Sequence, residues 1–136
     1  MKLRIAILVF ALISISMGDV YGADWKLYSS NDESVDFYDA QSIAHPSTNI
    51  VRVWQKRIFT EKDVARWVAK LGPSFKNLSF SMSLKEINCI EKKWHTLSLT
   101  AYDNEGGVIN SSSSSTEWGF IIPETIAESL YKEVCK

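Results

Sequence analysis

The chain has 136 residues, of which 46% are hydrophobic, 12% aromatic and 23% charged, and its formal net charge is −1. This length fits one domain, and the composition is typical of a globular protein rather than a disordered or collagen-like one. The near-neutral charge argues against a nucleic-acid-binding protein, which usually carries an excess of Lys and Arg. Two cysteines are too few for a disulfide-dense miniprotein or a four-cysteine zinc site.

The first 22 residues have the layout of a secretory signal peptide. Lys2 and Arg4 precede an apolar run over residues 5–15, and residues 20–22 place small or permissive side chains where cleavage after Gly22 requires them. The run is shorter than the ~20 residues that a membrane-spanning helix needs. We therefore expect no stable membrane insertion and a mature domain over residues 23–136, located in the periplasm, at the cell surface or outside the cell.

The first half of the mature chain predicts three strands and a helix. Short strands are expected at 24–28 and 35–38, followed by a loop over 45–49 that contains His45. The clearest strand is 50–59, where Val51 and Val53 alternate with polar and aromatic residues. Thr60 then has the character of an N-cap, and the apolar spacing of residues 64, 67, 68 and 71 before Gly72-Pro73 predicts a short amphipathic helix.

The second half predicts a series of hairpins and a closing helix. Strands are expected at 80–89, with Phe80, Met82 and Leu84 on one face, and at 92–102, with Leu97 and Leu99 toward the core. The turn at 103–107 leads to a partner strand from Val108, and the serines at 111–115 indicate a solvated edge strand or loop. A helix is predicted over 123–135, with Pro123 at its first position.

Consecutive strands that are joined by short turns favour an antiparallel sheet. The expected fold class is therefore α+β: a single antiparallel β-sheet of about six strands packed against a C-terminal helix, with one additional short helix. Leu84 and Cys89 have opposite parity although both are expected to face that helix, so we hypothesise a β-bulge near Lys85-Glu86 that also turns Ile87 inward.

Catalytic and metal-binding patterns are weak. His45 and His95 lack the spacing of a metal site, and a single-histidine haem contact is the one cofactor option left open. The acidic residues Asp32, Glu33 and Asp36 lie near a turn, where solvated carboxylates are the ordinary expectation. We expect no catalytic residue, no metal and no cofactor, and hence no enzyme.

An aromatic and basic face is the stronger candidate for function. If Val51 and Val53 face the core, strand alternation turns Arg52, Trp54 and Lys56 away from it, and the same reasoning places Trp94 and Tyr102 on that outer surface. Exposed Trp, Tyr and Arg are typical of protein interfaces. The alternative is that these aromatics only stabilise the sheet through cross-strand pairs.

Cys89 and Cys135 are better suited to a structural disulfide than to a redox or metal pair if the chain is exported to an oxidising compartment. The bridge would close a loop of 46 residues (135 − 89) and stabilise the fold by about 4 kcal/mol in the chain-entropy model.

Short motifs over nearly the whole mature chain give a family resemblance. They are Trp25, Tyr38-Asp39 with Ser42-Ile43, Val51-Arg52-Val53-Trp54-x-Lys56, Glu86-x-x-Cys89, Tyr102-Asp103-x-x-Gly106, Val108-Ile109, Trp118, Ile122-Pro123 and Leu130 to Cys135. In this order they resemble the surface-adhesin protein E family of exported bacterial proteins.

The resemblance implies an antiparallel sheet with a C-terminal helix and a Cys89–Cys135 disulfide. It also implies adhesion to host extracellular proteins such as vitronectin and laminin, and it associates the chain with homodimers and haem binding. The expected function is an exported binding domain that adheres to a protein partner through its aromatic and basic face. The alternative is a periplasmic envelope accessory protein that binds a small ligand or a protein partner without catalysis.

Overall fold

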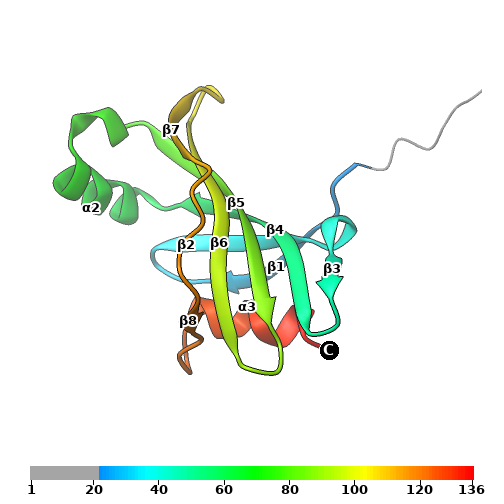
Figure 1. Ribbon diagram of the computed structural model, residues 1–136. Helices are drawn as coiled ribbons and strands as arrows, with labels where there is room; N and C mark the ends of the chain where they lie inside the picture. Colours follow the sequence, from blue (N-terminus) through cyan, green and yellow to red (C-terminus); the bar gives the residue numbers. More distant parts are fainter. Residues whose placement is uncertain (1–21) are drawn as a thin grey trace, which may run out of the picture.

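The computed structural model describes residues 22–136, so the expected signal peptide lies outside the described residues except for Gly22. One antiparallel sheet is built along the path β1-β2-β4-β5-β6-β7, with β3 paired to β4 and β8 paired to β6 (Figure 1). The strands are β1 (Trp25–Ser30), β2 (Ser34–Asp39), β3 (Ala44–Ser47), β4 (Ile50–Phe59), β5 (Leu78–Asn88), β6 (Lys93–Asp103), β7 (Val108–Ser112) and β8 (Gly119–Phe120).

In the described part of the chain the α-helices are α2 (Glu61–Leu71) and α3 (Ile126–Val134), accompanied by the 3₁₀ turns Ala40–Ser42 and Pro73–Phe75. The expected α+β class, with a C-terminal helix against the sheet and one further short helix, is confirmed. Helix α2 begins as the sequence indicates, because the Thr60 side chain accepts a hydrogen bond from the Asp63 backbone N–H at 3.4 Å. It ends at Gly72, whose φ of 102° is a conformation that favours glycine.

Two element boundaries differ from expectation. Helix α3 starts at Ile126 rather than at Pro123, because Thr125 has an extended backbone and its side chain caps the Glu128 N–H. Residues 44–47 were expected to lie largely in a loop but form β3, in which Ala44 pairs with Arg52 and Ser47 with Ile50. The first difference is due to a local cap, whereas the second depends on pairing with β4, which the local pattern of residues 44–47 does not contain.

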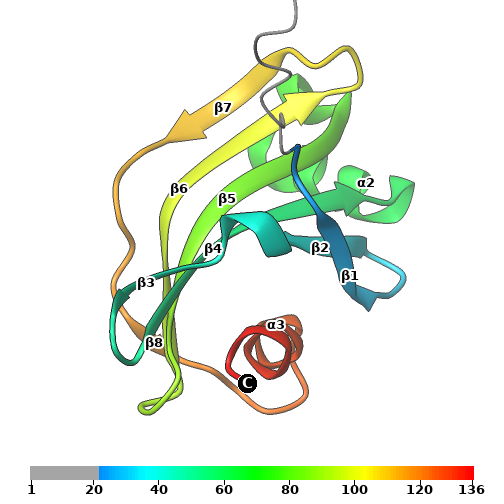
Figure 2. The ribbon, with the colours of Figure 1, turned by 90° about the vertical axis from the view of Figure 1, so that its right-hand side faces the viewer.

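The core lies between α3 and the face of the sheet that we call the inner face. Val53 and Ile87 are fully buried there and pack in one cluster with Val51, Leu130 and Val134. Figure 2 shows α3 end-on beneath the curved sheet. The disulfide Cys89–Cys135, with a Cα–Cα distance of 5.6 Å, ties the end of α3 to the end of β5, which confirms the expected pairing.

The hypothesised bulge near Lys85-Glu86 is wrong. Strands β4 and β5 pair without interruption from Ile50 opposite Asn88 to Ile58 opposite Phe80. The register shift lies on the other side of β5, where Leu84 faces Ser98 but Lys85 faces Thr96, so that Leu97 of β6 is the extra residue. Leu84 therefore points away from α3, whereas Ile87 and Cys89 share the inner parity and need no repair.

We expect Ile87→Ala to lower the free energy of unfolding by about 2–5 kcal/mol, because it leaves a cavity in a fully buried site. The measurement is urea denaturation of the oxidised protein. Leu84→Ala, three residues away on the opposite face, is the control and should cost clearly less. Equal losses for the two variants would contradict the assignment of faces.

Candidate functional site

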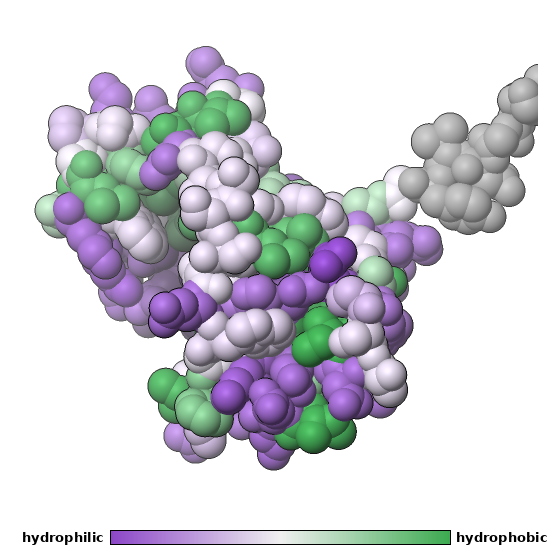
Figure 3. Space-filling model, in the orientation of Figure 1, coloured by the Kyte–Doolittle hydropathy of each residue, from purple (hydrophilic) through white to green (hydrophobic). Residues whose placement is uncertain are grey.

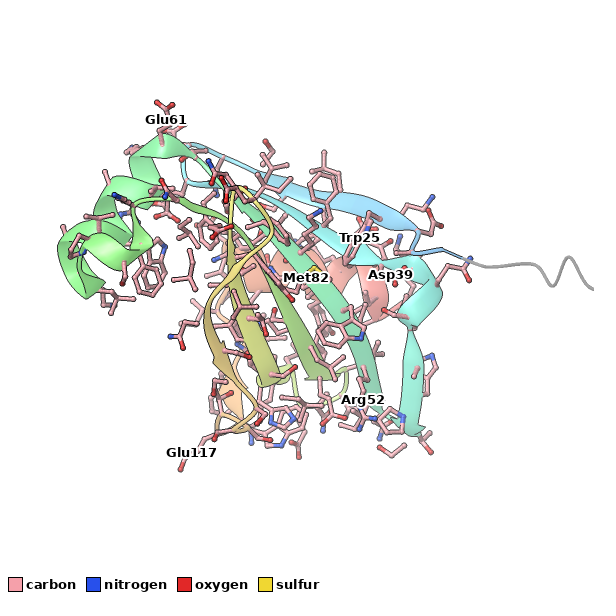
Figure 4. All side chains as sticks on the ribbon, turned by 90° about the horizontal axis from the view of Figure 1, so that it is seen from above. Trp25, Asp39, Arg52, Glu61, Met82 and Glu117 are labelled. Atoms are coloured by element: carbon pink, nitrogen blue, oxygen red, sulfur yellow. A yellow bond between two sulfur atoms is a disulfide. The ribbon has the colours of Figure 1, made fainter. Side chains whose placement is uncertain are left out.

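No helix of residues 22–136 covers the surface of the sheet opposite α3, which we call the outer face. In Figure 4 the strands lie in front of α3, and Trp25, Arg52 and Met82 are labelled on this side. Directly paired residues share a face, and the pairs of β4 and β5 on the outer face include Trp54 with Leu84, Lys56 with Met82, and Ile58 with Phe80. The outer face includes Trp25, Phe37, Arg52, Trp54, Lys56, Ile58, Phe80, Met82, Leu84 and Tyr102.

Lys56 lies at the centre of an aromatic group on the outer face. Its Nζ is 4.9 Å from the ring centroid of Phe80 and 6.0 Å from that of Trp25, distances typical of cation–π contact. Phe80 in turn stacks on Tyr102, with ring centroids 4.7 Å apart. These contacts hold the cation and two rings in a fixed arrangement, while Trp54 and Ile58 beside them remain 37% and 39% exposed.

A charged network continues the outer face toward β8. Glu86 Oε2 accepts hydrogen bonds from Arg52 at 3.0 and 2.8 Å, and Glu86 Oε1 lies 2.8 Å from Nε2 of His95. Burial opposes ionisation of Glu86, but the bonds to His95 and Arg52 outweigh it and hold the pKa of the carboxyl below its usual range. The Trp118 ring stacks on His95, with centroids 3.9 Å apart.

His95 does not fit the single-histidine haem contact, because both of its ring nitrogens are engaged. Its Nδ1 lies 3.2 Å from the Thr116 carbonyl oxygen, and Nε2 faces Glu86. His45 is exposed on β3. In the described part of the chain, no group of three or more His, Cys, Asp or Glu residues is arranged to hold a metal ion.

Four of the five predicted binding residues share the outer face, and one does not. Arg52, Trp54, Lys56 and Tyr102 lie together there. Trp94 was expected beside them but is on the inner face, opposite Ile87 and against the buried cluster. The reason is the extra residue Leu97, which reverses the parity of β6, so that Trp94 shares a face with Leu99 rather than with Tyr102.

The inner face carries a second candidate site, which sequence reasoning missed. Helix α3 covers one part of this face and α2 projects beside another part (Figure 1). Apolar groups are visible at the α2 end in Figure 3, as well as over the centre and lower part of the molecule. Between the two helices lies a cleft of about 300 Å³, which we call the α2–α3 cleft. Trp67 and Leu71 of α2, Leu99 of β6 and Ile126 of α3 contribute to its walls.

The floor of the cleft is polar and is organised by Asp36. This carboxylate was expected to be solvated but is fully buried, because Ser34 and Asp36 point to the inner side of β2. It accepts hydrogen bonds from Arg57 Nε at 2.7 Å, Gln55 Nε2 at 3.0 Å and Ser34 Oγ at 2.6 Å. Its charge is therefore neutralised by Arg57 and its lone pairs are occupied, as a buried carboxylate requires.

Lys85 is the second cation of the floor. Its Nζ donates to Thr96 Oγ1 at 2.7 Å and lies 4.6 Å from the Trp94 ring centroid. The pKa of Lys85 is lowered to about 8, chiefly by burial and also by the nearby Arg57, while Asp36 opposes the change. Burial also raises the pKa of the neighbouring Tyr28 phenol well above its usual value, and Asp36 adds to that rise. Lys85 precedes Ile87 by two residues, and alternate residues of a strand share a face, so this spacing could have placed Lys85 on the inner face.

We expect the protein to become more stable between pH 8 and pH 9.5. In this window the folded Lys85 releases its proton while the unfolded one, with an ordinary pKa near 10.5, still binds it, so the free energy of unfolding should rise by about 1–2 kcal/mol. The window stays below the pH at which the Tyr28 phenol ionises in the unfolded chain.

The measurement is urea denaturation at both pH values. Lys85→Met should remove most of the rise, whereas Lys56→Met, which removes a cation from the outer face, should keep it. The same rise in Lys85→Met as in the unaltered protein would contradict the account.

The fold is shared with solved structures of Haemophilus influenzae protein E. Crystal form II is 12% identical, with a TM-score of 0.53 over 85% of this chain and 96% of that chain. The selenomethionine form is 13% identical, with a TM-score of 0.52 over 85% and 92%. Protein E from the non-typeable organism is 15% identical, with a TM-score of 0.51 over 87% and 78%. At these identities the likeness establishes the fold alone.

Family membership rests on a separate comparison. No match was found among curated protein sequences. The family model described as surface-adhesin protein E matches residues 25–136, which include every strand and helix described above. The chain belongs to the surface-adhesin protein E family.

Proposed function

We propose that this chain is an exported bacterial binding domain that adheres to a protein partner through its outer face. The observation that supports this best is that two apolar side chains, Trp54 and Ile58, are partly exposed beside Lys56. The Lys56 ammonium group lies within cation–π distance of the Trp25 and Phe80 rings. Trp, Tyr and Arg dominate the energetics of protein interfaces, and Lys56 and Arg52 supply charge that orients a partner. Because the chain belongs to the surface-adhesin protein E family, the proposed partners are host extracellular matrix proteins.

The arrangement suits binding because it is largely preorganised. Lys56 is fixed by Trp25 and Phe80, Tyr102 by its stack on Phe80, and Arg52 by its paired hydrogen bonds to Glu86. Side chains that are already ordered lose little conformational freedom when a partner docks. An open sheet face of this kind fits another folded protein better than it fits a small molecule, which requires a concave site.

Export is part of the same proposal. The layout of residues 1–22 supports it, and so does the disulfide, which is typical of proteins in oxidising compartments. Within residues 22–136, no helix combines the length and apolar character needed to cross a membrane.

Trp54→Ala should weaken binding to immobilised vitronectin or laminin by at least about tenfold, because a central tryptophan of an interface is a typical hot spot. The melting temperature should stay nearly unchanged, since the side chain is partly exposed on an uncovered face. Ile90→Ala, an exposed apolar residue in the turn after β5, is the matched control and should bind normally. Undiminished binding by Trp54→Ala would contradict the proposed face, and failure of the unaltered protein to bind either matrix protein would exclude both as partners.

An adhesin must be reachable from outside the cell. Protease added to intact cells should therefore cleave the protein, while a periplasmic marker protein in the same cells stays intact. Protection of the protein until the outer membrane is opened would exclude the adhesin and favour an envelope accessory protein.

A further inference from the structure

The α2–α3 cleft is independent of the outer face and has the attributes of a small-molecule site. Its volume of about 300 Å³ lies at the lower end of the range for ligand pockets. Its walls are apolar, but Leu71 and Leu99 remain 48% and 45% exposed, so the walls do not close on each other. The cleft therefore offers apolar surface that a ligand could cover.

One wall of the cleft is held in place before any ligand arrives. The Trp67 indole N–H donates to Asp63 Oδ2 at 3.2 Å, and the ring packs edge-on against Phe59 with centroids 6.5 Å apart. The Asp63 carboxylate is itself buried at the first turn of α2. This fixes a flat aromatic surface next to Leu71, as a preformed site requires.

The floor of the cleft carries one positive charge that no described carboxylate neutralises. Arg57 is paired with the buried Asp36, which leaves Lys85 as the uncompensated cation. An ammonium group has three N–H donors, and Thr96 accepts from one of them. Among residues 22–136 no carboxylate forms an ion pair with Lys85 Nζ, and its other close contact is the ring of Trp94 at 4.6 Å, so no oxygen of these residues other than Thr96 Oγ1 accepts a hydrogen bond from it.

We propose that the α2–α3 cleft binds a small amphipathic carboxylate, with its head group on Lys85 and its aliphatic chain against Trp67, Leu71 and Ile126. The charge selects an anion, because an anion cancels the net charge of the floor, whereas a cation would add to it. The apolar walls select an aliphatic body, and the volume limits it to a chain of about ten carbons. The site lies on the inner face and does not depend on the proposed adhesion.

The test is isothermal titration of the purified, oxidised protein with decanoate below its micelle concentration. Decanol has the same chain without the charge, decylamine reverses the charge, and butyrate keeps the charge but shortens the chain. We expect 1:1 binding of decanoate, with each of the other three at least tenfold weaker. Equal affinity for decanol, or no measurable binding of decanoate, would overturn the proposal.

Two variants locate the site. Lys85→Met should weaken decanoate binding at least tenfold, while Lys56→Met, which removes an equal charge from the outer face, should leave it within twofold. Leu71→Glu places a carboxylate on a half-exposed position of the wall and should also abolish binding without unfolding the protein, as melting curves can verify.

Unaltered binding in both Lys85→Met and Leu71→Glu would show that decanoate binds elsewhere and would overturn the assignment. Trp54→Ala should bind decanoate normally, so failure of the adhesion proposal and failure of this one are distinguishable. If a peptide with an apolar C-terminal residue bound the cleft more tightly than decanoate, the proposal of a small-molecule ligand would be overturned in favour of the C-terminus of a protein.

Discussion

The unbroken pairing of β4 with β5 determines which side chains meet α3 and which remain outside. Because alternate residues of a strand point to opposite faces, burial of Val53 and Ile87 on one side places Trp54 and Lys56 on the other. The same alternation carries Arg57 and Lys85 past the end of α3 to the floor of the cleft. Both candidate sites therefore depend on the pairing of β4 with β5. A register shift of one residue would turn the side chains of each face to the opposite face.

Charge is handled differently on the two faces. On the outer face, the buried carboxylate of Glu86 is shared between His95 and Arg52, and only the Arg52 side chain is substantially exposed, so these bonds fix the geometry of all three groups. On the inner face, Asp36 is fully buried, and its cost of desolvation is offset by Arg57, Gln55 and Ser34 together. Arg57 is therefore neutralised by its ion pair with Asp36, whereas Lys85, in the same cleft, forms no ion pair with a described carboxylate.

Much of the fold could be predicted from the sequence because its signals are local. The first six residues of β4 alternate in burial, α2 has a capping threonine and a C-terminal glycine, and the motif set led to the correct family. The face of Trp94 could not be predicted, because one extra residue in β6 reverses parity and nothing in the local pattern marks Leu97 as that residue. The burial of Asp36 could not be predicted either, because it depends on Arg57 and Gln55, which lie about twenty residues away on another strand. The outer face was thus found in large part, and the cleft was not.

The position of α3 in the chain has a consequence for biogenesis. Leu130 and Val134 complete the core, and Cys135 closes the bridge to Cys89, yet these residues follow every described strand. A chain that is made and exported from its N-terminus cannot cover the inner face until these residues arrive, and a nine-residue helix is too short to be stable before it docks. If the chain is exported as proposed, the sheet therefore cannot be locked while the chain crosses the membrane. The disulfide can form only once α3 has docked, so its closure marks the completion of the domain.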